Sequence, residues 1–236
     1  MAQEKLIKNI VIVHGQYLDA SGWKGVYSIL TKKGYHVTLV QNPLTSLKDD
    51  VEATNHILES QDGPTILVGH AWGGTVITEA GVHPKVEGLV YVTGFVPDIG
   101  ETTWKLARSF PTLPEMRTEA PDTGGYIFYD RSSFRVGATG ELSKEDADFL
   151  NASQLPIYKD CFGTPVTNAA WRTKPSYGIV TINDRAINPD LQKSMYKNAK
   201  MKTTELKGGY LVYISQPQAV ADVIIASITK KINSFL

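Results

Sequence analysis

The sequence predicts an α/β fold with a mostly parallel central sheet and flanking helices. Short apolar, β-branched runs alternate along the chain with amphipathic segments of helical period, as in strands joined by helices within one sheet. The first run, residues 10–13, ends at His14-Gly15, a tight loop of the kind that follows a buried parallel strand. At 236 residues, the chain fits a single domain, 1–236, with a full core.

Further predicted elements continue this alternation in the first half of the chain. A helix is expected from residue 21 to a glycine stop at Gly34, because apolar residues recur there at helical spacing. The remaining predicted elements are a strand at 35–40, a helix at 47–60, a strand from 65 to 68, a helix at Gly73-Gly74 and a strand at 86–92. The order is therefore strand and helix in strict alternation.

Between about residues 97 and 171 the regular alternation stops. Prolines, Gly124-Gly125 and an amphipathic stretch at 144–150 predict irregular helices, which we interpret as a cap inserted into the domain. Alternation then resumes with a strand at 178–182, a helix at 189–198, a short strand at 203–206 and a closing helix at 217–235.

Composition narrows the classes of function. Lys plus Arg and Asp plus Glu number 24 each, so no charge excess favours nucleic acid, and we expect a small-molecule ligand. The lone Cys161 cannot form an intrachain disulfide, and the first residues lack a secretory signal, so the sequence predicts a cytoplasmic protein. No apolar run approaches the roughly 20 residues that cross a bilayer, so no membrane association is expected. We expect a monomer or a homodimer.

Metal and nucleotide sites are not indicated. The five histidines show no metal-ligand spacing, and no glycine-rich phosphate-binding pattern follows a strand. The sequence therefore predicts no metal and no cofactor.

The sharpest local pattern is Ile66-Leu67-Val68-Gly69-His70-Ala71-Trp72-Gly73-Gly74, a buried strand, a tight turn and a helix start. In a nucleophile elbow the middle residue of such a turn is a strained serine, and the glycines allow the backbones to approach. Ala71 stands at that position, and a methyl group can neither attack a carbonyl nor donate a proton. The backbone N–H of Trp72, at the helix N-terminus, would be an oxyanion-hole donor.

With these motifs the chain resembles bacterial α/β-hydrolases of the small esterase type over nearly its whole length. The matching segments are Val13-His14-Gly15, Asp19-Ala20-Ser21-Gly22-Trp23, Gly69-His70-x-x-Gly73-Gly74, Asp184-Arg185-x-Ile187 and Gln216-Pro217-x-x-Val220. The resemblance implies an α/β-hydrolase fold with the triad acid at Asp184, the histidine position at Tyr210 and the nucleophile position at Ala71. It also implies that serine-triad hydrolysis is lost.

Other departures from the family pattern fall on the same pocket, at Gln16-Tyr17-Leu18 and Tyr177-Gly178. Their clustering suggests a rebuilt cavity, and engineering of the chain is one hypothesis for it. Predicted ligand-contacting residues are Gln16, Tyr17, Trp72, Phe95 and Tyr177.

Several residues keep two interpretations at this point. Tyr210 is either a donor aimed at a ligand or a plug bonded to Asp184, and Asp184 is either a base or neutralised by Arg185. Trp72 either stacks on a planar ligand or packs on the cap. Cys161 is more typical of a buried thiol than of a displaced nucleophile. His70 is expected to be structural.

Three functions remain open on the sequence alone. The first is a repurposed enzyme in which Asp184 acts as general base and Tyr210 or Gln16 donates a hydrogen bond. The second is a non-catalytic pseudoenzyme that binds an aromatic or ester-like molecule. The third is weak residual hydrolysis, through the oxyanion hole and a water or through Cys161.

Overall fold

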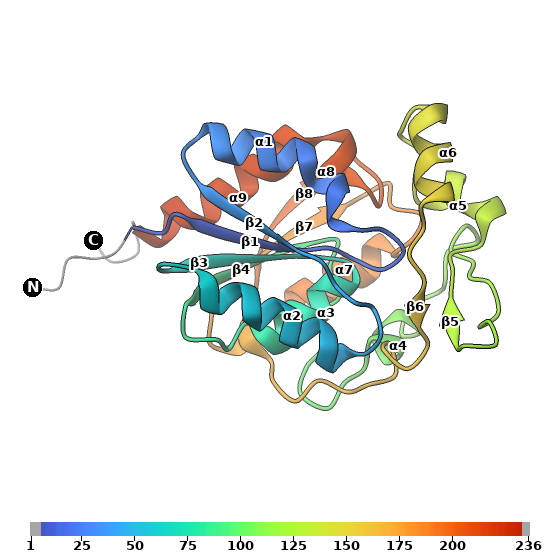
Figure 1. Ribbon diagram of the computed structural model, residues 1–236, viewed down its shortest axis with the longest axis horizontal. Coiled ribbons are helices and arrows are strands. Elements are labelled where there is room, and N and C mark those ends of the chain that lie inside the picture. The colour runs from blue at the N-terminus through green and yellow to red at the C-terminus, as the bar shows by residue number, and fades with distance from the viewer. Residues whose placement is uncertain (1–5, 233–236) are drawn as a thin grey trace, which may run out of the picture.

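A six-stranded parallel sheet forms the centre of the molecule, in the strand order β2-β1-β3-β4-β7-β8 (Figure 1). The computed structural model describes residues 6–232. The sheet strands are β1 (Asn9–Val13), β2 (His36–Val40), β3 (Thr65–His70), β4 (Val86–Val92), β7 (Ser176–Thr181) and β8 (Lys202–Leu206). Every residue of β1 and β3 is buried, as expected for central strands covered on both faces.

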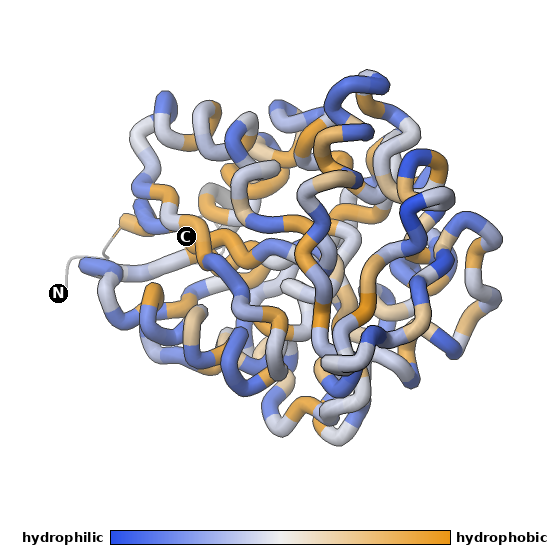
Figure 2. Tube along the Cα trace, turned by 45° about the vertical axis from the view of Figure 1, so that its right-hand side comes forward, coloured by the Kyte–Doolittle hydropathy of each residue, from blue (hydrophilic) through white to orange (hydrophobic). Residues whose placement is uncertain are grey.

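Helices cover both faces of this sheet. On one face α1 (Lys24–Lys32) packs against α9 (Pro217–Ile232), and on the other α2 (Leu47–Ser60) packs against α3 (Trp72–Ala80) (Figure 1). α7 (Pro189–Asn198) packs on β7, and the short α8 (Val212–Ser215) joins β8 to α9. Figure 2 shows hydrophilic and hydrophobic stretches alternating along the chain.

Most predicted elements agree with the structure. The helix at 47–60, the helix at 189–198 and the strand at 86–92 have the predicted bounds, because each has clear start and stop signals. The Ser46 hydroxyl caps α2 by accepting from the Asp49 backbone N–H at 3.0 Å. The helix predicted from residue 21 divides into a 3₁₀ turn, Ala20–Trp23, and α1. The predicted end of the closing helix, at residue 235, lies outside the described residues, as do the first five residues.

The segment between β4 and β7 lies beyond the carboxyl ends of the strands (Figure 1). Its elements are α4 (Thr103–Ala107), β5 (Tyr126–Ile127), α5 (Arg131–Gly137), α6 (Lys144–Ala152), β6 (Ile157–Tyr158) and a 3₁₀ turn, Ala170–Arg172. β5 and β6, which are separated along the chain by α5 and α6, pair as an antiparallel ribbon of two residues each, too short for any sequence periodicity. We call residues 97–171 the cap.

The cap is attached to the sheet domain by specific polar contacts. The Glu79 carboxylate on α3 accepts from the Thr167 backbone N–H at 2.6 Å and from the Asn168 amide at 2.7 Å. Arg172 forms an ion pair with Asp98 at 2.6 Å. These contacts hold the last residues of the cap against α3 and join its first residues to Arg172, just after its end.

Of the helices in residues 6–232, none is both long and apolar enough to span a bilayer.

Candidate functional site

The nucleophile elbow keeps its backbone geometry without a nucleophile. Ala71 joins β3 to α3 with φ 48° and ψ −113°, in the left-handed range that costs a non-glycine residue about 1–3 kcal/mol. Gly73 and Gly74 make this turn possible, because a Cβ on them would lie 2.4 Å from the Val13 carbonyl and 2.5 Å from that of Phe95. The strained turn is thus held by close backbone packing.

The predicted oxyanion-hole donor is already used. The backbone N–H of Trp72 donates a hydrogen bond of 2.9 Å to Oε1 of Gln16, from the loop after β1. A substrate oxyanion would have to displace this amide oxygen to reach the donor. The site therefore lacks a free oxyanion donor at Trp72 as well as a nucleophile at Ala71.

The indole of Trp72 points away from the ligand side of the site. Its Nε1–H donates to Oδ2 of Asp50 at 2.7 Å, and its ring meets Phe162 edge to face at 5.5 Å between centroids. Asp50 also accepts from the Leu44 backbone N–H at 2.8 Å, and burial raises its pKa to about 6. Of the two interpretations of Trp72, the structure shows packing between α2 and the cap.

Every hydrogen-bonding direction of the Asp184 carboxylate is occupied. Oδ1 accepts from the backbone N–H groups of Ala186 at 2.8 Å and Ile187 at 2.9 Å. Oδ2 accepts from the Thr181 hydroxyl at 3.0 Å and the Gln192 amide at 2.9 Å.

Burial raises the pKa of Asp184 to about 6, against the opposing effect of these four donors. The neighbouring Arg185 does not neutralise Asp184, because its guanidinium contacts Glu115 at 3.4 Å. Asp184 forms no hydrogen bond with Tyr210, so the expected acid–histidine link has no counterpart here.

His70 is held in a structural role behind the elbow. Its Nε2–H donates to the Tyr210 carbonyl at 2.9 Å, since a carbonyl can only accept. Burial lowers the pKa of His70 to about 3, so the ring is neutral at physiological pH. The Tyr210 and Tyr213 rings each lie 4.7 Å from it between centroids. His70 therefore supports the loop that carries Tyr210.

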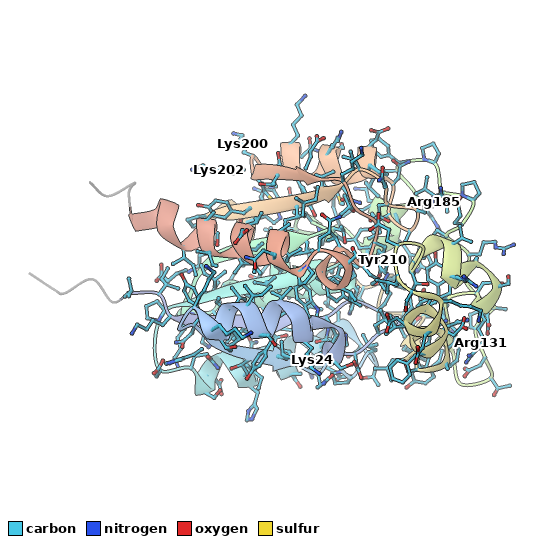
Figure 3. The ribbon with its side chains drawn as sticks, turned by 90° about the horizontal axis from the view of Figure 1, so that it is seen from above. Lys24, Arg131, Arg185, Lys200, Lys202 and Tyr210 are labelled. Carbon is cyan, nitrogen blue, oxygen red and sulfur yellow. The ribbon has the colours of Figure 1, made fainter. Side chains whose placement is uncertain are left out.

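Two tyrosine hydroxyls at the site have no hydrogen-bond partner among the described residues: those of Tyr17 and Tyr210. The Tyr17 side chain is 1 % exposed and that of Tyr210 2 %. Burial raises the pKa of both phenols above the ordinary value of 10, so each remains a protonated donor. Figure 3 shows Tyr210 where the sheet domain meets the cap.

Both tyrosines line a partly enclosed, mostly apolar cavity of about 200 Å³ between the sheet and the cap. Its lining comprises Gln16, Tyr17, Phe95, Thr103, Trp104, Ala107, Arg108, Pro111, Thr112, Leu113, Met116, Thr118, Tyr129, Phe162, Ala186, Ile187, Asn188, Leu191 and Tyr210. This volume is at the low end for small-molecule sites, so only a small ligand fits.

The lining of this cavity includes some of the predicted site residues but not all of them. Gln16, Tyr17, Phe95 and Tyr210 line it, whereas Ala71, Trp72 and Asp184 are not among its lining residues. Tyr177 is on β7, where its ring lies 6.0 Å below the Lys202 ammonium and away from the cavity.

The sequence analysis missed the lining that the cap supplies, notably Trp104, Arg108, Met116 and Tyr129. These residues belong to irregular segments without a motif, and only the aromatic run at 126–129 gave a signal.

Cys161 is not placed for catalysis. It is fully buried, its Sγ lies 3.7 Å from the Leu44 carbonyl, and it is absent from the cavity lining. Burial raises the pKa of its thiol to about 12, so the nucleophilic thiolate is not formed at neutral pH.

An open cleft of about 740 Å³ lies on the other side of Tyr210 and borders Asp184. Arg135, Glu141 and Arg185 give it mixed charge. Its wide opening lets water solvate these groups, so the enclosed cavity is the better ligand site. In residues 6–232 no three metal-ligating side chains form a cluster.

The parallel sheet, the tight turn at Ala71 and the cap together define a protein of the α/β-hydrolase type. The model of the Alpha/beta hydrolase family matches residues 10–223. The chain therefore belongs to the Alpha/beta hydrolase family.

Named relatives are distant but extend over most of the chain. The chain is 26% identical to "Alpha/beta hydrolase nvfD" of Aspergillus novofumigatus, over 91% of this chain and 94% of that protein. It is 23% identical to "Methylesterase 9" of Arabidopsis thaliana, over 93% of this chain and 97% of that protein.

Solved structures share the fold. A pyrethroid hydrolase from Sphingobium faniae gives a TM-score of 0.81 at 21% identity, covering 94% of this chain and 98% of that one. A tomato methylketone synthase I variant complexed with β-ketoheptanoate gives 0.78 at 19% identity, covering 96% of this chain and 99% of that one. The two relatives by sequence thus come from a fungus and a plant, and the two solved structures that share the fold come from a bacterium and a plant.

Proposed function

We propose that this chain is a non-hydrolytic member of its family that binds a small, mostly apolar carbonyl compound in the cavity between sheet and cap. The observation that carries the proposal is a pair of buried phenol hydroxyls without a partner among the described residues, on Tyr17 and Tyr210, two residues that line that cavity. A buried donor without an acceptor costs about 1–3 kcal/mol, which a ligand oxygen would recover.

Three features support a loss of serine-triad hydrolysis. The nucleophile position is Ala71, the N–H of Trp72 is bonded to Gln16, and the histidine position is a phenol whose raised pKa makes it a poor base. Each alone would slow hydrolysis, and together they remove the nucleophile, the base and one oxyanion donor. Residual hydrolysis through the oxyanion hole also has less support, because the Trp72 N–H is already bonded to Gln16.

General-base chemistry through Asp184 has less support than binding. Its four hydrogen bonds occupy both oxygens, and it lies outside the cavity lining. A base must come within hydrogen-bond reach of the proton that it removes. The phenols of Tyr17 and Tyr210 meet that condition as donors, not as bases.

The test is calorimetric titration with 2-hexanone, a small ketone that offers one acceptor and cannot be hydrolysed. A Tyr17→Phe/Tyr210→Phe double variant should bind it roughly 10-fold or more weakly, because two hydrogen bonds to the carbonyl are lost. Tyr129→Phe is the matched control, since Tyr129 also lines the cavity but already donates to the Glu115 carbonyl at 2.9 Å. Equal affinity of the double variant and the parent would overturn the proposal.

The predictions of cellular location, oligomeric state and engineered origin are also proposals, each with its own test. We propose a cytoplasmic monomer or homodimer, which light scattering of the purified chain would distinguish. An engineered origin of the pocket would be refuted by a natural genomic copy with the same residues at 16, 17, 71 and 210.

A further inference from the structure

Arg108 is the one charged residue among the cavity-lining residues that the structure describes. It directly follows α4 in the cap, and its side chain is exposed to solvent at the cavity. Its guanidinium carbon lies 4.6 Å from the centre of the Trp104 ring, which also lines the cavity. Stacking on an indole restricts the guanidinium group to one wall of the cavity.

No carboxylate within residues 6–232 lies within ion-pair distance of Arg108. Four other cations of this region are paired, Lys105 with Glu101, Arg117 with Asp130, Arg172 with Asp98 and Arg185 with Glu115. Arg131 and Arg135 of the cap also lack a carboxylate within ion-pair distance among the described residues, but they do not line the cavity. The cavity thus combines a cation lacking an internal counter-charge with two phenol donors lacking internal acceptors. These are independent observations on residues that line the same cavity.

We propose that Arg108 makes the cavity selective for small oxo acids, with the ligand carboxylate at Arg108 and its carbonyl oxygen at Tyr17 and Tyr210. The inference rests on the proposed function and adds the charge of the ligand to it. A guanidinium group binds a carboxylate through two parallel N–H···O bonds, which suits a single cation on a neutral wall. The apolar side chains of Phe95, Met116 and Leu191 would contact the carbon chain between the two polar ends.

The test uses a matched pair of ligands, 5-oxohexanoate and 2-hexanone, which differ only in a terminal carboxylate in place of a methyl group. The parent should bind the oxo acid roughly tenfold more tightly at low ionic strength. Raising sodium chloride to about 0.5 M should shrink this preference, because the ion pair at the exposed rim is screened.

Arg108→Gln should abolish the preference for the oxo acid, so that the variant binds 5-oxohexanoate and 2-hexanone with similar affinity, and Arg108→Lys should retain part of the preference. Arg131→Gln is the control: Arg131 is also an exposed cap arginine, 5.9 Å from the Phe128 ring centre, but it lies outside the cavity lining (Figure 3). Unchanged unfolding midpoints by circular dichroism would show that each variant is folded.

Equal affinity of the parent for both ligands, or a preference that survives in Arg108→Gln, would overturn this inference and leave the proposed carbonyl site intact. Absence of binding for both ligands would overturn the proposed function and the inference together. A preference lost only in Arg108→Gln and not in Arg131→Gln would support it.

Discussion

Asp184 and Tyr210, which the family resemblance assigns to two triad positions, differ sharply in their hydrogen bonding. Both are buried, but Asp184 accepts four hydrogen bonds from its own loop and from α7, whereas the Tyr210 hydroxyl has no partner among the described residues. A buried polar group that is fully satisfied stabilises the fold, and one that is unsatisfied at a cavity wall destabilises it. The Asp184 carboxylate therefore stabilises its loop against α7, whereas the unpaired Tyr210 hydroxyl indicates a ligand.

The largest expected effect is the difference in unfolding free energy between a variant that lacks the Asp184 carboxylate and one that lacks the Tyr210 hydroxyl. Asp184→Ala should lower the free energy of unfolding by roughly 3–5 kcal/mol, because it leaves four buried donors without an acceptor. Tyr210→Phe should change it by no more than about 1 kcal/mol, since no protein hydrogen bond is lost. Urea unfolding followed by circular dichroism measures both values.

Tyr196→Phe provides the control for a buried tyrosine that is satisfied. Its hydroxyl accepts from the Gly94 N–H at 2.8 Å and donates to the Gly94 carbonyl at 3.2 Å, so its loss should cost about 1–3 kcal/mol. If Tyr210→Phe were as destabilising as Tyr196→Phe, the Tyr210 hydroxyl would have a partner in the protein and the contrast would fail.

A second set of variants distinguishes the effect on hydrolysis of the residues at 71 and 210 from the effect of the hydrogen bond between Gln16 and the Trp72 N–H. An Ala71→Ser/Tyr210→His variant should hydrolyse p-nitrophenyl acetate only slowly, because Gln16 still accepts from the Trp72 N–H. Adding Gln16→Ala should raise the rate by roughly 10²-fold, the usual contribution of one oxyanion donor. Initial rates of p-nitrophenol release measure the difference.

Gln16→Ala in the parent background is the control and should remain inactive, because it has no nucleophile. If the double variant were as active as the triple variant, Gln16 would yield the Trp72 donor to a substrate without cost. The hydrogen bond between Gln16 and Trp72 would then make no contribution to the proposed loss of hydrolysis.

The sheet and its helices could be predicted from the sequence because each element carries its own local signal. Residues 47–60 have a serine cap, acids in the first turn and an apolar face, and α2 has those bounds. The elbow was equally clear, since Gly69, Gly73 and Gly74 are needed wherever backbones pack this closely.

The contacts of the site could not be predicted, because they join distant segments. Gln16 was expected to contact a ligand and does line the cavity, but the sequence did not indicate that its side-chain amide oxygen accepts from a backbone N–H fifty-six positions away. Trp72 was assigned two alternatives, and only the position of Asp50 on α2 decides between them. Arg108 lies in the irregular cap, where neither periodicity nor motif marks it.

The smallest expected effect is a pH dependence that distinguishes the two positions. Burial raises the pKa of Asp184 from 3.8 to about 6, so between these values the native state binds more protons than the unfolded state. The contribution of Asp184 to stability is therefore fully present below about pH 4 and is lost as pH rises through about 6. A shift of this size corresponds to about 2–3 kcal/mol.

Subtracting the profile of Asp184→Asn isolates this effect, because surface acids with lowered pKa, such as Asp98 beside Arg172, act in the opposite sense in both proteins. The difference in unfolding free energy, parent minus variant, should fall by about 2 kcal/mol between about pH 4 and pH 7. A constant difference would mean that the four donors offset burial and hold the pKa of Asp184 at its ordinary value. Tyr210→Phe should leave the profile of the parent unchanged, because burial keeps the Tyr210 phenol protonated throughout this range.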